Sequence, residues 1–426
     1  KLYKPAELKT QQVFFWEIID MGFTSDILHS NRKGKVRHGS VHKPVHHSVS
    51  FSFDDARELA YVFQGKKSGY SYGRQVNPTV TALQEKIDLM EKSYETVAFG
   101  TGMAAIGSTI FSLLRPGDHF ISSSFLFGNT NSLFQSFMSH GIEISFVDAT
   151  CAENVRAAIK ENTKLVFVET IANPRTQISD LEGIGQLCKS KALIYFVDNT
   201  LTTPYLYSPI TSGANLVINS LTKYIGGHAN ALGGAVSVFD NFEWGNLSSI
   251  DDRYKQGAPV NWVVKQIKKK GLRDFGASLG PEAAHLISVG SDTLALRMDR
   301  ISSNAMALAH YLDGHSLVEK VHYPGLVSHP EHNRAKKLFS AFGGILSIEI
   351  KDEIDCFDFI NRFDLIACAS NLGDTRTLCI PVAHSIYHEM GPVRRKEMGI
   401  ADSLIRFSVG IEEFDDLRMD LERSLI

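Results

Sequence analysis

The chain has 426 residues and a nearly balanced charge, with 44 Lys and Arg against 47 Asp and Glu. Without a basic excess or cluster, a nucleic-acid partner is disfavoured, because such binding depends on neutralising phosphates. A hydrophobic share of 43% provides material for a core and excludes a disordered chain. The five cysteines form no Cys-x-x-Cys pair, which indicates a reducing, cytoplasmic location rather than a disulfide scaffold.

The first part of the chain, residues 1–75, is rich in Gly, Ser and His and has weak periodicity, which predicts an extended arm. Four of its histidines are close in sequence, but their spacing fits no zinc pattern, so we predict no metal site there. They are His38, His42, His46 and His47.

An uncharged run of 19 residues, Thr96 to Leu114, is nominally long enough to cross a membrane. It contains three glycines and several hydroxyl residues, and no aromatic belt flanks it. A turn followed by a buried helix is therefore the favoured interpretation, and we expect no membrane partner.

Short β-branched runs alternate with helical patterns through the middle of the chain. The predicted strands are His119–Ser122, Glu143–Val147, Lys164–Val168, Leu193–Val197, Leu216–Ile218 and Gly234–Val238. Helices are expected between them, for example over Ala152–Glu161 and Leu181–Lys189. This alternation predicts βαβ crossovers and an α/β fold with a mostly parallel sheet. Ligands of such sheets bind beyond the carboxyl ends of the strands.

A long helical pattern over Leu294–Leu312 leads into a second, smaller α/β unit. Its predicted strands and helices are Ile345–Ile350, Ile354–Arg362, Ile366–Ala369, Leu404–Val409 and Phe414–Ser424. We therefore divide the chain into an arm (1–75), a large domain (76–290) and a small C-terminal domain (291–426).

The most informative motif runs from Asn219 to His228 and follows a predicted buried strand. Its Lys223 stands among the small hydroxyl residues Ser220 and Thr222, just before a glycine-rich turn. Burial at the carboxyl end of a strand lowers the pKa of a lysine and allows it to form a Schiff base. The alternative for any single lysine is a solvated surface cation.

A second motif ends a predicted strand in Asp198, 25 residues before Lys223. A carboxylate there can keep a heteroaromatic nitrogen protonated, although an Asp after a strand is also common in turns. A third motif, Phe99–Ala104, exposes helix amides that can bind phosphate, but it is neither a dinucleotide nor a Walker pattern. Together the three motifs indicate a phosphorylated pyridine aldehyde as ligand.

These residues resemble the Cys/Met-metabolism (transsulfuration) family of pyridoxal-phosphate enzymes, whose fold is the aspartate-aminotransferase type, PLP fold type I. Its members include O-acetylhomoserine sulfhydrylase, cystathionine synthases and lyases, and methionine γ-lyase. The resemblance extends from about Tyr72 to Glu412. The matching motifs are Tyr72–Thr79, Gly102–Met103, Glu169–Pro174, Val197–Thr200, Ser220–Lys223 and Leu404–Gly410.

The resemblance implies pyridoxal 5'-phosphate (PLP) as the cofactor, held by Lys223, which would also move protons. Asp198 would pair with the pyridine nitrogen and Asn173 would contact the ring hydroxyl. Arg406 would bind the carboxylate of an amino-acid substrate as a bidentate guanidinium. The implied phosphate ligands are Gly102, Met103, Ser220 and Thr222.

The family also implies a homo-oligomer with shared active sites. The arm would contact the neighbouring subunit, where Tyr72 and Arg74 would complete the phosphate site. The chain would then be at least a dimer, and family members are usually tetramers.

One position departs from the family pattern. Most members place a Tyr over the cofactor ring in a Leu-Tyr-Gly motif, whereas this chain has Phe127 there. A phenyl ring can stack on the cofactor but cannot transfer a proton. His384 and His388 lie in a segment expected near the substrate and are candidate polar contacts.

The resemblance implies that the protein makes or breaks a C–S bond by elimination or replacement at Cβ or Cγ of an amino acid. Asn371, a candidate substrate contact in an Asn-Leu-Gly-Asp motif, and the long segment Asp240–Asp274 resemble the sulfhydrylase branch. They favour γ-replacement of the O-acetylhomoserine sulfhydrylase type. The alternatives are cystathionine β-lyase, cystathionine γ-lyase or synthase, and methionine γ-lyase.

Two further classes are disfavoured. A non-catalytic protein of the same fold would not need the complete set of cofactor residues that this chain has. A transaminase is disfavoured because the motifs around Arg74 and Lys223 resemble those of the sulfur branch.

Overall fold

The computed structural model describes residues 22–30, 36–351 and 353–425. A seven-stranded sheet with the order β1-β7-β6-β5-β4-β2-β3 forms the centre of its larger part. Strands β2 to β6 are parallel, and only β7 is antiparallel to its neighbours, which confirms the predicted α/β fold. The strands are β1 (Glu95–Phe99), β2 (His119–Ser123), β3 (Glu143–Val147), β4 (Thr163–Glu169), β5 (Ile194–Asp198), β6 (Leu216–Asn219) and β7 (Gly234–Val238).

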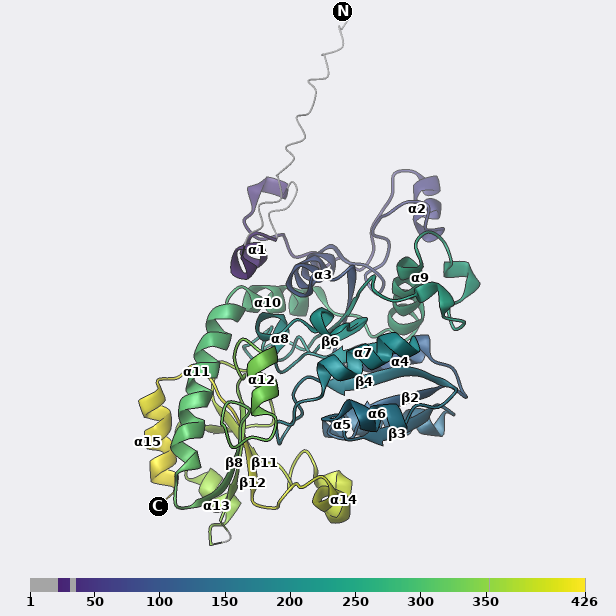
Figure 1. Ribbon diagram of the computed structural model, residues 1–426. Coiled ribbons are helices and arrows are strands. Elements are labelled where there is room, and N and C mark those ends of the chain that lie inside the picture. Colours follow the sequence, from purple (N-terminus) through teal and green to yellow (C-terminus); the bar gives the residue numbers. More distant parts are fainter. Residues whose placement is uncertain (1–21, 31–35, 352, 426) are drawn as a thin grey trace, which may run out of the picture.

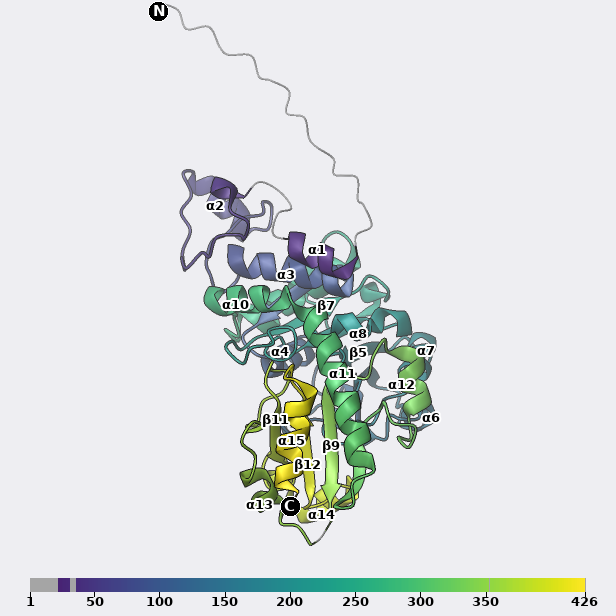
Figure 2. The same cartoon turned by 90° about the vertical axis from the view of Figure 1, so that its left-hand side faces the viewer.

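Helices cover both faces of this sheet (Figures 1 and 2). Alternate residues of a central strand belong to different apolar clusters: Val166 and Val168 of β4 point into one, Leu165 and Phe167 into the other. A strand buried on both faces needs the continuous apolar run that the sequence shows. The helices of this part are α3 (Pro78–Glu91), α4 (Gly102–Leu113), α5 (Gly128–Ser139), α6 (Ala152–Ala157), α7 (Leu181–Lys191), α8 (Thr203–Leu206), α9 (Pro259–Gln266) and α10 (Pro281–Ser291).

A five-stranded sheet with the order β10-β11-β12-β9-β8 forms the smaller part. We call this sheet and helices α11 to α15 the small unit. Its strands are β8 (Val318–His322), β9 (Ile345–Ile350), β10 (Ala367–Cys368), β11 (Leu378–Pro381) and β12 (Leu404–Ser408). Its helices are α11 (Leu294–Asp313), α12 (His332–Leu338), α13 (Cys356–Asn361), α14 (Gly391–Glu397) and α15 (Phe414–Ser424). Helix α11 runs from the large sheet to the small one (Figure 1).

Several predicted elements are shorter than expected, among them the helix over Ile354–Arg362, which spans only Cys356–Asn361, and β8 and β11 were not predicted. The strand expected over Ile366–Ala369 has only two residues, because the carboxylate of Asp420 accepts hydrogen bonds from the amides of residues 364–366. The helix expected over Ala152–Glu161 ends at Ala157. There the hydroxyl of Thr163 accepts the amide of Lys160 and forms a turn.

In its described residues, 22–30 and 36–75, the predicted arm contains two short α-helices, α1 (Phe23–His29) and α2 (Ala56–Phe63). Helix α2 has no buried residue and stands away from both sheets in both views (Figures 1 and 2). The contact of the arm with a neighbouring subunit, and the domain boundaries after residues 75 and 290, stay predictions.

The uncharged run from Thr96 to Leu114 forms most of β1, a turn and the buried helix α4. Within the described ranges, no helix has the length and apolarity needed to cross a membrane.

Candidate active site

A cavity of about 320 Å³ lies beyond the carboxyl ends of β4, β5 and β6. The large part supplies most of its wall, and the small unit contributes Ser370, Leu372 and Arg406. Nine of the predicted site residues line it: Gly102, Met103, Phe127, Asn173, Asp198, Ser220, Thr222, Lys223 and Arg406. The location agrees with the general rule for parallel sheets.

Lys223 follows β6 in a tight turn, in which its amide donates to the carbonyl of Ser220 over 3.1 Å. Its Nζ donates to Oδ1 of Asn371 in the small unit over 2.7 Å. Burial, together with the charge of Arg406, lowers the pKa of Lys223 to about 8. About a tenth of this amine is therefore unprotonated at pH 7, far more than for an ordinary lysine, and is available as a nucleophile or base.

Arg406, on β12, is a buried cation whose described contacts are neutral. Its Nη2 donates to the carbonyls of Asn371 and Ser370 over 2.9 and 3.3 Å. The Nε of Arg406 is buried without a hydrogen-bond partner, and no described carboxylate forms an ion pair with this side chain. Burial lowers the pKa of Arg406 to about 10. A buried guanidinium without a counter-ion is a binding site for a carboxylate.

Two carboxyl groups end neighbouring strands side by side, since Glu169 and Asp198 are paired in the register of β4 and β5. Oδ1 of Asp198 accepts the amide of Thr200 over 2.9 Å, and Oε1 of Glu169 accepts the amide of Phe127 over 3.0 Å. Burial raises the pKa of both, and the charge of Asp198 adds to the rise for Glu169. Neither forms an ion pair within the described ranges, so a protonated ring nitrogen would supply the missing cation.

The first turn of α4 provides a place for an anion. A Cβ on Gly102 would lie 2.9 Å from the Cβ of Ser220, so the close approach of helix and loop requires glycine. The hydroxyl of Thr101 caps the amide of Ala104. No hydrogen bond from the amides of Gly102 and Met103 occurs in the described structure, and free helix amides bind phosphate.

The hydroxyl of Thr222 already exchanges hydrogen bonds with the backbone of Gly233, over 3.2 and 3.0 Å. A bound phosphate would therefore share the hydroxyl of Thr222 with the backbone of Gly233. Oδ1 of Asn173 is buried in the cavity wall without a partner. With the acidic pair and the free amides, these groups fit a pyridine ring that carries a hydroxyl and a phosphate.

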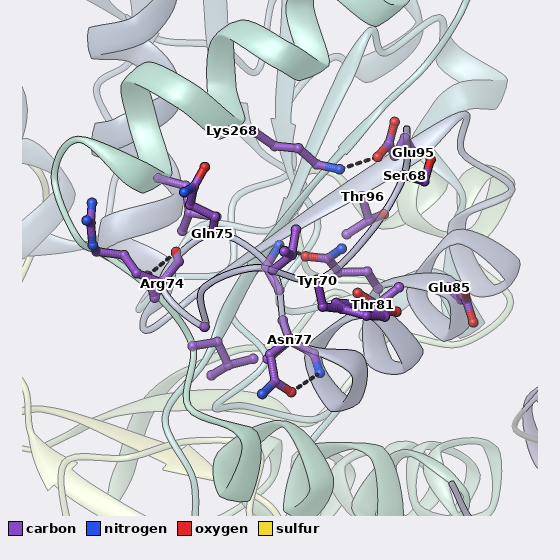
Figure 3. Close-up of a pocket in the computed structure, with 18 of the residues that line it drawn as sticks. Ser68, Tyr70, Arg74, Gln75, Asn77, Thr81, Glu85, Glu95, Thr96 and Lys268 are labelled. Carbon is purple, nitrogen blue, oxygen red and sulfur yellow. Dashed lines mark hydrogen bonds and ion pairs between the residues drawn. The ribbon is translucent and has the colours of Figure 1, made fainter. Parts of the chain in front are cut away.

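The structure of one chain does not bring Tyr72 and Arg74 to this cavity. Arg74 lines a different cavity of about 530 Å³, between the arm, α3 and β1 (Figure 3). Its guanidinium donates to the carbonyl of Arg273 over 2.7 Å and lies 5.6 Å from the ring centre of Tyr72. His384 and His388 are both exposed and do not line the cavity of Lys223 either.

Two residues of this region had no predicted role. Glu169 opens the motif Glu169–Pro174. It ends the strand next to the one that Asp198 ends, and this position was the available signal. Tyr387 lies behind the cavity wall, fully buried, and bonds two loops of the large part. No spacing in the sequence indicated it.

Comparisons with known proteins show which sequences and structures this chain is similar to. The sequence model of the family described as Cys/Met metabolism PLP-dependent enzyme matches residues 24–426. An L-methionine gamma-lyase from Fusobacterium nucleatum subsp. polymorphum is 36% identical over 91% of this chain and 94% of its own. A cystathionine beta-lyase from Coxiella burnetii is 35% identical over 94% of this chain and 96% of its own.

A solved structure, a putative O-acetylhomoserine (thiol)-lyase from Campylobacter jejuni, has a TM-score of 0.88 and 30% identity. The match covers 95% of this chain and 100% of that one, and that protein carries a pyridoxyl-lysine phosphate. The predicted fold, of the aspartate-aminotransferase type, is confirmed by this likeness.

Proposed function

The chain belongs to the Cys/Met metabolism family of PLP-dependent enzymes, and on that premise we propose that it replaces the γ-substituent of O-acetylhomoserine by a sulfur nucleophile. PLP is its cofactor, and it acts on C–S bonds in methionine and cysteine metabolism. When bound, PLP withdraws electrons from Cα of an amino acid, which weakens the bonds around Cα and Cβ. The side chains of the cavity then decide which bond breaks.

We assign the cofactor contacts as follows. Lys223 holds PLP, and its lowered pKa allows it to attack as a free amine. Asp198 supplies the counter-charge for a protonated ring nitrogen, and Asn173 offers its free amide oxygen to the ring hydroxyl. Phe127 stacks on the ring. Phosphate contacts come from Gly102, Met103, Ser220 and Thr222.

Arg406 positions the substrate. Its buried, unpaired guanidinium offers two parallel N–H groups to the α-carboxylate, which fixes the amino acid in one orientation. Asn371 lies between this arginine and Lys223. Its backbone carbonyl accepts a hydrogen bond from Arg406, and its side-chain oxygen accepts one from Lys223. Asn371 does not itself line the cavity, and we propose that it contacts the substrate close to Cα once Lys223 has released its side chain. Lys223 can then move protons at Cα and Cβ.

The described cavity wall has no phenol over the cofactor ring to protonate a leaving group, and this carries the choice of reaction. The buried carboxyl groups of Glu169 and Asp198 belong to the proposed site of the ring nitrogen. The ionisable side chains in the described wall of the cavity are Glu169, Asp198, Lys223 and Arg406, with Phe127 where relatives place a phenol. A thiol leaving group, with a pKa of about 8.5, needs a proton to depart easily, whereas a carboxylate with a pKa of about 4 does not. An acetyl ester therefore suits this site better than a thioether, and a lyase acting on cystathionine or methionine is the second candidate.

A homo-oligomer is part of the proposal. Tyr72 and Arg74 are both exposed and lie outside the cavity of Lys223, which supports a role at the site of a neighbouring chain. A dimer of shared sites, paired into a tetramer, would use them.

All five cysteines are unpaired, which supports a reducing, cytoplasmic location.

The reaction is tested by mass-spectrometric product analysis of the PLP-loaded protein. One sample receives O-acetylhomoserine and sulfide, a second L-cystathionine and a third L-methionine. We expect homocysteine in the first and little oxo acid in the others. Rapid 2-oxobutyrate or pyruvate formation from a thioether, with no homocysteine in the first sample, would reject the proposal in favour of a lyase.

A further inference from the structure

A single buried hydroxyl joins the small unit to two loops of the cavity. Tyr387 is 1% exposed, and its OH lies 2.9 Å from the carbonyl of Leu126 and 2.5 Å from the carbonyl of Asn173. One phenolic proton serves both acceptors, either shared or in exchange. The loops follow different strands, since Leu126 comes after β2 and Asn173 after β4.

Each loop presents a side chain to the cavity directly beside the bonded carbonyl. Phe127 follows Leu126, and Asn173 is itself part of the wall. The backbone of Phe127 is held from both sides, because its amide donates to Glu169 over 3.0 Å while the preceding carbonyl accepts from Tyr387. Movement of the Tyr387 hydroxyl would therefore move the phenyl ring and the amide of Asn173 together.

The packing around Tyr387 leaves little freedom. A Cβ on Gly128 would lie 2.8 Å from the carbonyl oxygen of Ile386, so the turn before Tyr387 rests directly on the start of α5. Other groups of the small unit hold the loop after Asn173: Ser347 donates to the carbonyl of Pro174 over 2.7 Å, and Arg334 to that of Ile178 over 2.8 Å. Among the described hydrogen bonds, the side chain of the small unit that reaches both loops is Tyr387.

We infer that Tyr387 is a positioning residue, which holds Phe127 and Asn173 in place against the cofactor ring. Through Tyr387, the position of the small unit on the large part then affects how the cofactor is held. The inference rests on the proposed cofactor site, but not on the choice of sulfur reaction. Tyr387 does not line the cavity, so it has no contact with reacting atoms. Burial, with the charge of Glu169, raises its pKa and keeps the phenol a hydrogen-bond donor.

The first test uses the cofactor-free protein. Tyr387→Phe keeps the ring and removes the hydroxyl, and we expect amide hydrogen exchange to rise at least threefold over residues 124–130 and 170–178. The matched control is Tyr195→Phe, because this buried hydroxyl also donates to a backbone carbonyl, that of Leu181, but near the amino end of β5. Unchanged exchange in Tyr387→Phe, or an equal rise at the same loops in the control, would overturn the inference.

The second test uses bound PLP. We expect Tyr387→Phe to weaken PLP binding about tenfold and to reduce the visible circular dichroism of the bound cofactor, while the KM for the amino acid changes little. When Tyr387→Phe is added to a Phe127→Leu variant, we expect a smaller loss of dichroism than when it is added to the wild type. The phenyl ring of Phe127, through which Tyr387 acts, is already absent from that variant. Equal losses in both backgrounds would show that Tyr387 does not act through Phe127.

The two proposals can fail separately. Loosened loops and altered dichroism without homocysteine production would reject the sulfhydrylase reaction and leave the role of Tyr387 intact. Homocysteine production with unchanged exchange and dichroism in Tyr387→Phe would reject the role of Tyr387 alone.

Discussion

Nζ of Lys223 donates a 2.7 Å hydrogen bond to Oδ1 of Asn371, so the reactive amine of the large part is held by a neutral amide of the small unit. A carboxylate in place of that amide would stabilise the charged lysine and raise its pKa from about 8. We therefore expect Asn371→Asp to shift the pH midpoint for PLP capture by the apoenzyme upward by about one unit or more. Stopped-flow absorbance between pH 6 and 10 measures it, with Asn371→Gln as the neutral control. An unshifted midpoint would show that the side chain at position 371 does not influence the pKa of Lys223.

Arg406 should bind the substrate through its carboxylate. Arg406→Lys keeps the charge but loses the two parallel donors, so we expect the KM for the amino acid to rise about 30-fold, which corresponds to about 2 kcal/mol, the lower end of the cost of a disrupted buried charge pair. The visible absorbance of bound PLP should remain. Steady-state kinetics with the substrate and its carboxamide provide the check, because the wild-type preference for the acid should nearly disappear in the variant. A retained preference would mean that another group binds the carboxylate.

Phe127→Tyr should change which substrates react. The added phenol can give a proton to a departing thiolate, and general acids contribute about 100-fold or more to such steps. We expect the kcat/KM ratio of cystathionine elimination to O-acetylhomoserine replacement to rise by about that factor. Product analysis of both reactions with wild type and variant measures the ratio. An unchanged ratio would show that the phenyl ring is not the reason for the proposed preference.

Glu91, at the end of α3, is fully buried, and its Oε1 accepts Nδ2 of Asn219 over 2.6 Å and Nδ2 of Asn199 over 3.4 Å. Burial raises its pKa from 4.5 to about 7. The folded protein therefore keeps a proton that the unfolded chain has released, so this carboxyl stabilises the fold below pH 4.5 and loses that contribution as the pH rises through 7.

Glu91→Gln removes this titration and should make stability less dependent on pH. Relative to wild type, the variant should gain about 3 kcal/mol in the free energy of unfolding between pH 5 and pH 8, at 1.36 kcal/mol per pKa unit. Urea unfolding at several pH values measures the difference, and any constant offset from the new amide cancels. Parallel pH curves for the two proteins would contradict the raised pKa.

The sequence patterns were sufficient to predict the α/β fold and the importance of Lys223 and Asp198, which lie in one cavity, whereas the predicted Tyr72 and Arg74 do not line it. Asp198 and Lys223 follow neighbouring parallel strands, and the ends of such strands meet at one edge of the sheet. Arg406 was placed by family resemblance, because the docking of the small unit on that edge cannot be read from local periodicity. Predicted strands such as Glu143–Val147 agree with the structure because apolar β-branched runs bounded by turns are a local signal.

Contacts between the two parts escaped prediction. The hydroxyl of Tyr387 finds its acceptors 214 and 261 residues away in the chain. The short strand β10 depends on where Asp420 of α15 places its carboxylate. Such arrangements are decided by tertiary packing, and the same holds for Glu169, whose significance comes from a neighbour on another strand.

Lys223 as the cofactor-bearing lysine is tested most directly by borohydride reduction of the PLP-loaded protein, followed by proteolysis and peptide mass spectrometry. Reduction fixes the cofactor to the side chain that holds it. The predicted result is a phosphopyridoxyl group on the peptide that contains Lys223, and its loss in Lys223→Ala. A modified peptide containing a different lysine, such as the buried Lys86, or no modified peptide from a protein that has visibly bound PLP, would contradict the proposed site.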